Sequence, residues 1–406
     1  MTTPDTSLRR SISLPQLVLY GLGTTIGAGI YALTGEVAGA AGYGAPLSFL
    51  LASILAGFTA LSFAELSGRF PRAAGAAMYV QQGMGSRHLA ATVGLLVALA
   101  GIVSAAALIN AFIDQATALL PVARLPAQVI ASLLVVAIAA KGIRESVLVA
   151  SAITLVEVSG LLLVVYASRD GWLDADLAAL TGAGQPLAWQ GVFAGALLAF
   201  YAFIGFEDMV DVAEEVKQPR RNLPRAILLT LVSVTVLYTL IMAAAVLAVP
   251  PQTLAAQKAP LVFLYQHYAG GNGMTLAVIG LLAIINGALV QTVMASRVLY
   301  GLASRGQLPS VFSSVNTMTH TPLAATFAAG TALLLLTLAG SLAGLAEATS
   351  LLMLCVFALV NLALLRIKTR SAPAQGLQVP IWVPALGLLA CAGFILARGL
   401  QAASML

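Results

Sequence analysis

The stretch Gly21-Leu22-Gly23-Thr24-Thr25-Ile26-Gly27-Ala28-Gly29-Ile30-Tyr31 lies inside a long apolar segment, residues 15–41. A helix this rich in glycine is easily unwound, because glycine has more backbone freedom than any other residue. A second apolar segment, residues 189–216, contains Phe203-Ile204-Gly205-Phe206-Glu207-Asp208, with a glycine and two carboxylates well inside it. Each segment therefore has a natural breaking point within a hydrophobic helix.

The composition predicts that a lipid bilayer surrounds most of the chain. Of its 406 residues, 60% are hydrophobic and 9% are charged, whereas about one quarter of an ordinary soluble domain is charged. A helix of about 20 apolar residues crosses the hydrocarbon core. Eleven such spans are predicted, at residues 15–41, 45–68, 88–119, 125–141, 145–168, 189–216, 225–250, 273–303, 321–341, 343–366 and 379–399. We expect one all-α polytopic membrane domain over residues 1–406.

The basic residues predict the orientation, because Lys and Arg gather in short cytoplasmic loops. With a cytoplasmic N-terminus, all but four of the 20 Lys and Arg residues lie on the inner side. The four on the outer side are Arg124, Arg169, Lys258 and Arg398. Membrane orientation thus accounts for the net charge of +5, and no nucleic-acid partner is needed to explain it.

Cofactor chemistry and enzyme chemistry find no support in the sequence. Cys355 and Cys391 lie in apolar spans, where a thiol usually acts as a small buried hydrophobe. His88, His267 and His320 are far apart, so no metal-ligand cluster is expected. No nucleophile and base stand in a recognisable arrangement, so we expect neither a metal, nor a cofactor, nor an intramembrane enzyme.

The two breaking points open two blocks of five spans, which is the pattern of an inverted-repeat transporter with its site near the membrane midplane. The blocks are residues 1–168 and 189–366, and residues 379–399 form an extra helix. The hypothesis rests on position and matched breaks, since the halves show no convincing sequence identity. A different interpretation is open for span 1, where Gly23/Gly27 and Gly35/Gly39 have the spacing of helix-packing faces.

Unwound backbone would expose amides near Gly27, Ala28 and Gly29 and carbonyls near Thr25 and residues 200–204. Free amides at the start of a half-helix suit a carboxylate. Free carbonyls suit an ammonium group. An α-amino acid carries both.

At these residues the chain resembles the amino acid-polyamine-organocation superfamily, specifically the bacterial permeases close to cationic amino-acid transporters. The resemblance rests on Gly27-Ala28-Gly29-Ile30, Ala60-Leu61-Ser62-Phe63-Ala64-Glu65-Leu66, Arg69-Phe70-Pro71-Arg72-Ala73-Ala74-Gly75, Gly142-Ile143-Arg144-Glu145-Ser146, Phe203-Ile204-Gly205-Phe206-Glu207, Glu214-Glu215-Val216-Lys217-Gln218-Pro219, Ser296-Arg297-Val298-Leu299-Tyr300 and Gly306-Gln307-Leu308-Pro309. It implies a five-plus-five inverted-repeat fold with broken helices 1 and 6, and a substrate between spans 1, 3, 6, 8 and 10.

The resemblance also implies which residues bind the substrate. Its carboxylate would meet the segment from Gly27 to Ile30, and its amine would meet carbonyls near Thr25, Phe200, Tyr201, Phe203 and Ile204. The ring of Tyr201 or Phe203 would act as a gate, although ordinary core packing is the alternative for both. Glu207, Asp208 and Asp211 could favour a cationic side chain, or they could lie on the cytoplasmic half of span 6 and never meet the substrate.

Glu157 is the candidate for proton coupling. It lies eleven residues beyond Ser146, which places it about 16 Å along the helix and close to the middle of the bilayer. Intramembrane carboxyls usually face the protein interior and take part in function. Asn286 or the unwound part of span 1 is its expected hydrogen-bond partner. Glu207 is the second candidate for coupling, and a purely structural carboxyl is the alternative. In several proton-coupled relatives a lysine occupies this place, and Ile285-Asn286-Gly287 lacks the hydroxyls of sodium-coupled members, so a sodium site is not expected.

The remaining charged candidates form a predicted cytoplasmic gate, consisting of Glu65, Arg69, Arg144, Glu214, Glu215 and Arg297. They lie near helix ends and could pair across the inner face. Anchoring to the membrane surface is the alternative for each of them.

The sequence thus predicts a secondary transporter of amino acids in a bacterial plasma membrane, working by alternating access as a monomer or weak homodimer. Its partners would be the amino acid, the lipid bilayer and a coupling proton. A sodium-independent amino-acid or polyamine exchanger is the main alternative, and cationic and neutral substrates are equally open. A channel would need a continuous pore lined by polar rings, and a transporter-derived sensor would need a signalling domain.

Overall fold

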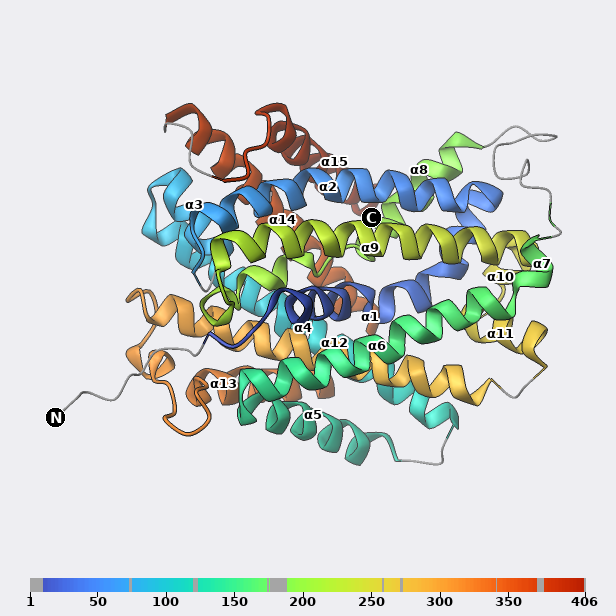
Figure 1. The fold of residues 1–406 in the computed structure, drawn as a ribbon, viewed down its shortest axis with the longest axis horizontal. Helices are drawn as coiled ribbons and strands as arrows, with labels where there is room; N and C mark the ends of the chain where they lie inside the picture. The colour runs from blue at the N-terminus through green and yellow to red at the C-terminus, as the bar shows by residue number, and fades with distance from the viewer. Residues whose placement is uncertain are drawn as a thin grey trace.

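In the computed structural model the described residues are 10–72, 75–119, 123–173, 175, 188–257, 259–270, 273–340, 342–370 and 376–404. Apart from an isolated bridge between Ile12 and Val216, the regular structure of these residues is helical. The long helices are α1 (Leu14–Ala41), α2 (Ala45–Arg69), α4 (Arg87–Leu119), α5 (Arg124–Lys141), α6 (Ile143–Ala167), α8 (Trp189–Tyr201), α9 (Pro219–Ala248), α12 (Met274–Ala303), α13 (Leu323–Ala339), α14 (Leu342–Arg370) and α15 (Trp382–Ser404). They form one bundle (Figure 1).

Each of these helices corresponds to one predicted span. Within the described residues, eight apolar helical segments are long enough to cross a membrane by length and composition. Two more apolar helices are shorter, α13 and the described part of α15 over Trp382–Leu396. Many side chains on the outside of the bundle are large and apolar, including Ile130, Val236 and Leu389, which is the surface that hydrocarbon chains require. The protein is therefore a multi-pass α-helical membrane protein.

The predicted break in span 6 is confirmed. Helix α8 ends at Tyr201, and irregular backbone leads to Gly205, whose φ of 127° is a conformation that favours glycine. The chain then forms two short 3-10 helices, η3 (Phe206–Val210) and η4 (Ala213–Glu215). Irregular backbone at this depth is tolerated because it lies inside the protein rather than against lipid.

The predicted break in span 1 is wrong for this structure, because α1 runs without interruption from Leu14 to Ala41. The glycines serve close packing instead. An added Cβ at Gly23 would meet the hydroxyl of Thr154 at 2.4 Å, and one at Gly35 would meet Pro260 at 2.9 Å. A glycine costs a helix only about 1 kcal/mol relative to alanine, and tight packing can offset that cost. The packing interpretation therefore holds for these two glycines.

Four of the five pairs of helices that are five spans apart lie against each other. Helix α1 packs against α8, α2 against α9, α4 against α12 and α5 against α13. This arrangement is what two related five-helix blocks would produce. The division into residues 1–168 and 189–366 stays a prediction.

Four shorter helices lie between the predicted spans. These are α3 (Gly75–Met84), α7 (Arg169–Leu173), α10 (Pro251–Ala255) and α11 (Pro260–Ala269). Helix α3 packs against α4 and α14, while α10 and α11 pack against α1. All four are too short to give a span signal, and the apolar residues of α3, α10 and α11 are buried only by the tertiary fold.

Candidate substrate-binding site

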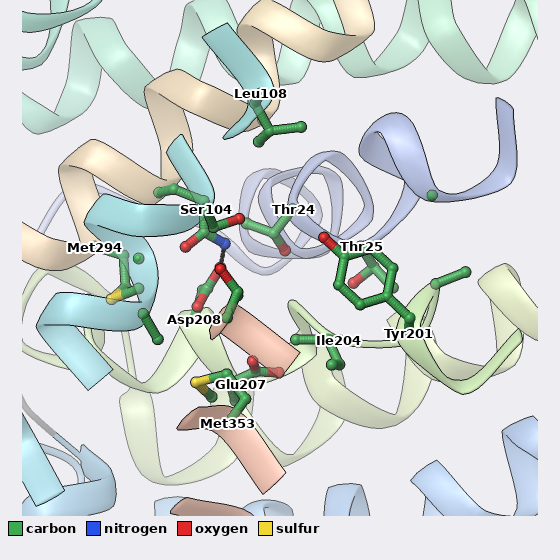
Figure 2. Close-up of a pocket in the computed structure, with 17 residues that line it drawn as sticks. Thr24, Thr25, Ser104, Leu108, Tyr201, Ile204, Glu207, Asp208, Met294 and Met353 are labelled. Atoms are coloured by element: carbon green, nitrogen blue, oxygen red, sulfur yellow. Dashed lines mark hydrogen bonds between the residues drawn. The ribbon is translucent and has the colours of Figure 1, made fainter. Parts of the chain in front are cut away.

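A cavity of about 60 Å³ lies where five long segments meet. Its walls come from α1, α4, the segment that begins at the end of α8, α12 and α14, which are the predicted spans 1, 3, 6, 8 and 10. Figure 2 shows Thr24 and Thr25 on one side of this cavity and Glu207 and Asp208 on the other. A space of this size holds a few water molecules, so binding of a larger ligand requires the walls to separate.

The break in span 6 is held tightly against α1. The hydroxyl of Thr24 donates a hydrogen bond to the carbonyl oxygen of Gly205 over 2.8 Å. An added Cβ at Gly205 would lie 2.6 Å from the carbonyl oxygen of Thr24, so no larger residue fits without a shift of backbone. Further along α1, Gly29 lies against Ala202. Glycines on both elements thus bring the two backbones together.

Two buried carboxyls form the acidic wall of the cavity. Glu207 is 3% exposed and Asp208 is 1% exposed. Glu207 accepts a hydrogen bond from the backbone N–H of Gly205 at 2.9 Å. Asp208 accepts one from the side-chain amide of Gln291 on α12 at 2.6 Å. These bonds hold both carboxyls in fixed positions beside the cavity.

Backbone carbonyls gather next to the same break. The hydroxyl of Tyr238 on α9 lies 2.9 Å from the carbonyl oxygen of Thr25 and 3.3 Å from those of Ile26 and Ala202. One hydroxyl has one proton, so it cannot satisfy three acceptors at once. The carbonyls of α1 and of the break form an acceptor-rich group, in which those of Thr25 and Ile26 also accept hydrogen bonds within the continuous helix α1. The predicted free carbonyl at Thr25 is therefore wrong for this structure.

Five of the predicted substrate residues line the cavity, namely Thr25, Gly29, Tyr201, Ile204 and Glu207. The others do not. Ile30 is buried in α1, and Gly27 and Ala28 lie in α1 with side-chain positions outside the described residues. The ring of Phe200 stacks on Phe394 with centroids 4.8 Å apart, and that of Phe203 packs edge-on against Tyr238 at 5.5 Å. Of the two proposed gate rings, only Tyr201 faces the cavity.

Several lining residues were not singled out from the sequence. The polar ones are Thr24, Ser104, Gln291 and Thr349. Each is a polar residue inside an apolar span, which is the signal that could have found them.

Glu157 on α6 is fully buried, and neither of its carboxylate oxygens has a hydrogen-bond partner among the described residues. The predicted hydrogen bond to Asn286 is wrong here, because the amide of Asn286 donates instead to Thr154 over 3.2 Å. Thr154 lies three residues before Glu157 on the same helix, and its hydroxyl oxygen accepts the hydrogen bond from the Asn286 amide. The hydroxyls of Tyr31 and Tyr238 lie within electrostatic reach of Glu157. Burial without a partner costs far more for a carboxylate than for the protonated acid.

The residues of the predicted gate form two separate ion-pair centres. Glu215 and Arg297 lie 3.4 Å apart, both with 0% exposed side chains, and join the end of the broken span to α12. Glu65 pairs with Arg69 on its own helix and with Lys368 of α14 at 2.7 Å. Lys368 was not predicted as part of the gate.

Two further gate candidates have no assigned place in these centres. Glu214 is partly exposed beside Glu215. The side chain of Arg144 lies outside the described residues.

The architecture matches that of a solved transporter. A structure described as the substrate-bound outward-open state of a Na+-coupled sialic acid symporter superposes with a TM-score of 0.65, covering 97% of this chain and 91% of that one. At 13% sequence identity the likeness concerns the fold alone. The chain therefore shares the helix-bundle fold of that membrane protein.

Sequence comparison gives the family. Residues 12–402 match the family model described as amino acid permease. "Cationic amino acid transporter 2, vacuolar" of Arabidopsis thaliana is 32% identical over 89% of this chain, which spans 60% of that relative. "Branched-chain amino acid permease BcaP" of Bacillus subtilis is 28% identical over 98% of this chain and 90% of its own length. The chain belongs to the amino acid permease family, and the resemblance to the amino acid-polyamine-organocation superfamily is confirmed.

Proposed function

We propose that the protein is a secondary carrier that moves amino acids across a membrane by alternating access. The observation that carries the proposal is the cavity between α1, α4, α12, α14 and the break that follows α8. It combines backbone carbonyls, hydroxyls and two carboxyls in one buried place, as recognition of a small charged molecule requires. The named relatives carry cationic and branched-chain amino acids, so both classes belong in the test.

The amine of the substrate would bind at the acceptor-rich end of the cavity. The carbonyls of Thr25 and Ala202 and the carboxyl of Glu207 lie there. The amides near Gly29, which were predicted to bind the carboxylate, are part of continuous helix in this structure and bond within it. The proposed contacts therefore concern the amine of the substrate.

Transport would be coupled to protons through Glu157, with Glu207 as the second candidate. A buried carboxyl without a partner can bind a proton in one conformation and release it when water or a cation reaches it in another. A sodium-independent exchanger of amino acids or polyamines is the alternative, and in that case Glu157 is structural. We propose further that the membrane is a bacterial plasma membrane and that the end bearing the ion pairs of Glu65 and Glu215 is cytoplasmic.

The test is uptake of labelled amino acids and polyamines into proteoliposomes that contain the purified protein, with and without an inward proton gradient. Gradient-stimulated uptake of one amino-acid class supports the carrier and its coupling ion together. Uptake that ignores the gradient but needs internal amino acid supports the exchanger. Absence of uptake for every compound contradicts the proposed substrate class.

A further inference from the structure

A second, larger cavity lies at the end of the bundle where α2 ends and α3 and α9 begin, at the left in Figure 1. Its volume is about 600 Å³, within the range of about 300–1,000 Å³ that is usual for small-molecule sites. Among the described residues that line it, five are arginine and none is acidic. The arginines are Arg10, Arg69, Arg72, Arg220 and Arg221.

Arg69 is the one arginine of this cavity that the fold buries, whereas Arg10, Arg72, Arg220 and Arg221 are exposed. Its side chain is 8% exposed and is held in place by the ion pair with Glu65. The Nε–H group of Arg69 is closed to solvent and has no hydrogen-bond partner among the described residues. A buried guanidinium donor without an acceptor is costly, and a small shift of this side chain toward an anion in the cavity would give it that acceptor.

Helix α9 adds positive potential to the same cavity. Its N-terminal residues Gln218, Pro219, Arg220 and Arg221 line the wall, and no side-chain hydrogen bond caps this end of the helix. Gln218 adopts a left-handed backbone conformation with φ of 48°, and its carbonyl oxygen accepts a hydrogen bond from the backbone N–H of Asn222. The N-terminus of a 30-residue helix carries a partial positive charge, which acts together with the arginines.

We propose that this cavity, lined by Arg10, Arg69, Arg72, Arg220 and Arg221, binds an anion that carries phosphate groups. Guanidinium groups bind phosphate oxygens through paired hydrogen bonds, and a multiply charged anion offsets the mutual repulsion of Arg10, Arg72, Arg220 and Arg221, while Arg69 is paired with Glu65. The phosphate comes from the headgroup of an anionic phospholipid or from a soluble phosphate compound. The site is separate from the cavity at the helix break and shares no lining residue with it.

The experiment uses the purified full-length protein in two arms. Pyrophosphate is titrated calorimetrically into lipid-free protein in neutral detergent at low ionic strength, where charge interactions are least screened. In parallel, native mass spectrometry counts phosphatidylglycerol retained from nanodiscs of equal phosphatidylglycerol and phosphatidylcholine. The variant is Arg220→Ala/Arg221→Ala. Its matched control is Arg225→Ala/Arg370→Ala, which removes the same charge from exposed positions outside the cavity.

Binding in either arm that the Arg220/Arg221 variant weakens by about tenfold or more, with the control near wild type, supports the site. Pyrophosphate binding identifies a soluble ligand, and binding confined to phosphatidylglycerol identifies a headgroup. If the double alanine variant unfolds, Arg220→Lys/Arg221→Lys replaces it and should still weaken binding, because lysine keeps the charge but loses the paired hydrogen bonds. Binding in neither arm, or equal weakening by variant and control, overturns the proposal.

Discussion

The hydroxyl of Thr24 donates to the carbonyl of Gly205 over 2.8 Å, and the space beside Gly205 admits no Cβ because the carbonyl oxygen of Thr24 would be 2.6 Å away. This contact fastens α1 to the break in span 6 beside the central cavity. Movement of either element must therefore be transmitted to the other, which is what a carrier needs when its cavity opens to one side.

Substitution of Gly205 by alanine tests this contact. The φ of 127° and the clash with Thr24 should together lower stability by about 1–3 kcal/mol and reduce uptake strongly. Gly376→Ala is the matched control, because its φ is 112° and nothing lies within 4 Å of an added Cβ. Uptake and thermal unfolding of both variants are compared with wild type. Equal effects of the two substitutions would show that backbone strain alone is responsible and that the contact is unimportant.

Glu157→Gln should abolish stimulation of uptake by an inward proton gradient while leaving folding and exchange intact. Glutamine matches glutamate in size but cannot release a proton. The control is Glu36→Gln, an exposed carboxyl on α1, which should keep the stimulation. The measurement is the initial rate of amino-acid uptake by each variant with and without the proton gradient. Full stimulation of uptake by the gradient in the Glu157 variant would show that this carboxyl is structural and does not couple transport to protons.

Gln291→Leu should raise the KM for uptake by about tenfold, because Asp208 loses the donor that holds it beside the cavity. Gln128→Leu is the control, since Gln128 is also buried but bonds to Asn110 in a separate cluster. Both variants should lose stability, and only the Gln291 variant should change KM. A KM change of the same size in both variants would show that Asp208 does not contribute to substrate binding.

The ion pair of Glu215 and Arg297 should behave as a unit. Arg297→Met leaves a buried carboxyl without its charge partner and should destabilise the protein by about 3–5 kcal/mol. Adding Glu215→Gln removes that unpaired charge and should restore part of the loss. Thermal unfolding of the two single variants and the double variant measures the coupling. Strictly additive losses would contradict a direct interaction.

How far the sequence predicts this structure depends on the kind of signal. The break after α8 was predictable because Gly205 and two carboxyls lie inside an apolar run. A regular helix at this place would expose charged groups to lipid. The continuity of α1 was not predictable, because glycines favour unwinding and close packing alike. Only the residues packed against α1, such as Thr154 and Pro260, decide between these two outcomes.

The candidate site could likewise be predicted only in part from the sequence. The central location of Glu157 follows from counting along its helix, whereas the choice of Thr154 as the partner of Asn286 depends on how α6 and α12 pack. Tyr201 and Phe203 are equivalent in sequence, and the irregular backbone between them turns one ring to the cavity and the other into the core. The basic cavity joins residues from the N-terminal segment, α2 and α9, and no local pattern reveals such a meeting.

The central claim is that the protein is an amino-acid carrier, and counterflow tests it most directly. Proteoliposomes are loaded with a high concentration of an unlabelled amino acid that supports uptake, diluted, and given the labelled compound outside. The account predicts saturable entry with a transient accumulation of label that requires the internal amino acid and is lost in Gly205→Ala. Entry that rises linearly with concentration and ignores the internal amino acid would contradict it and indicate a channel.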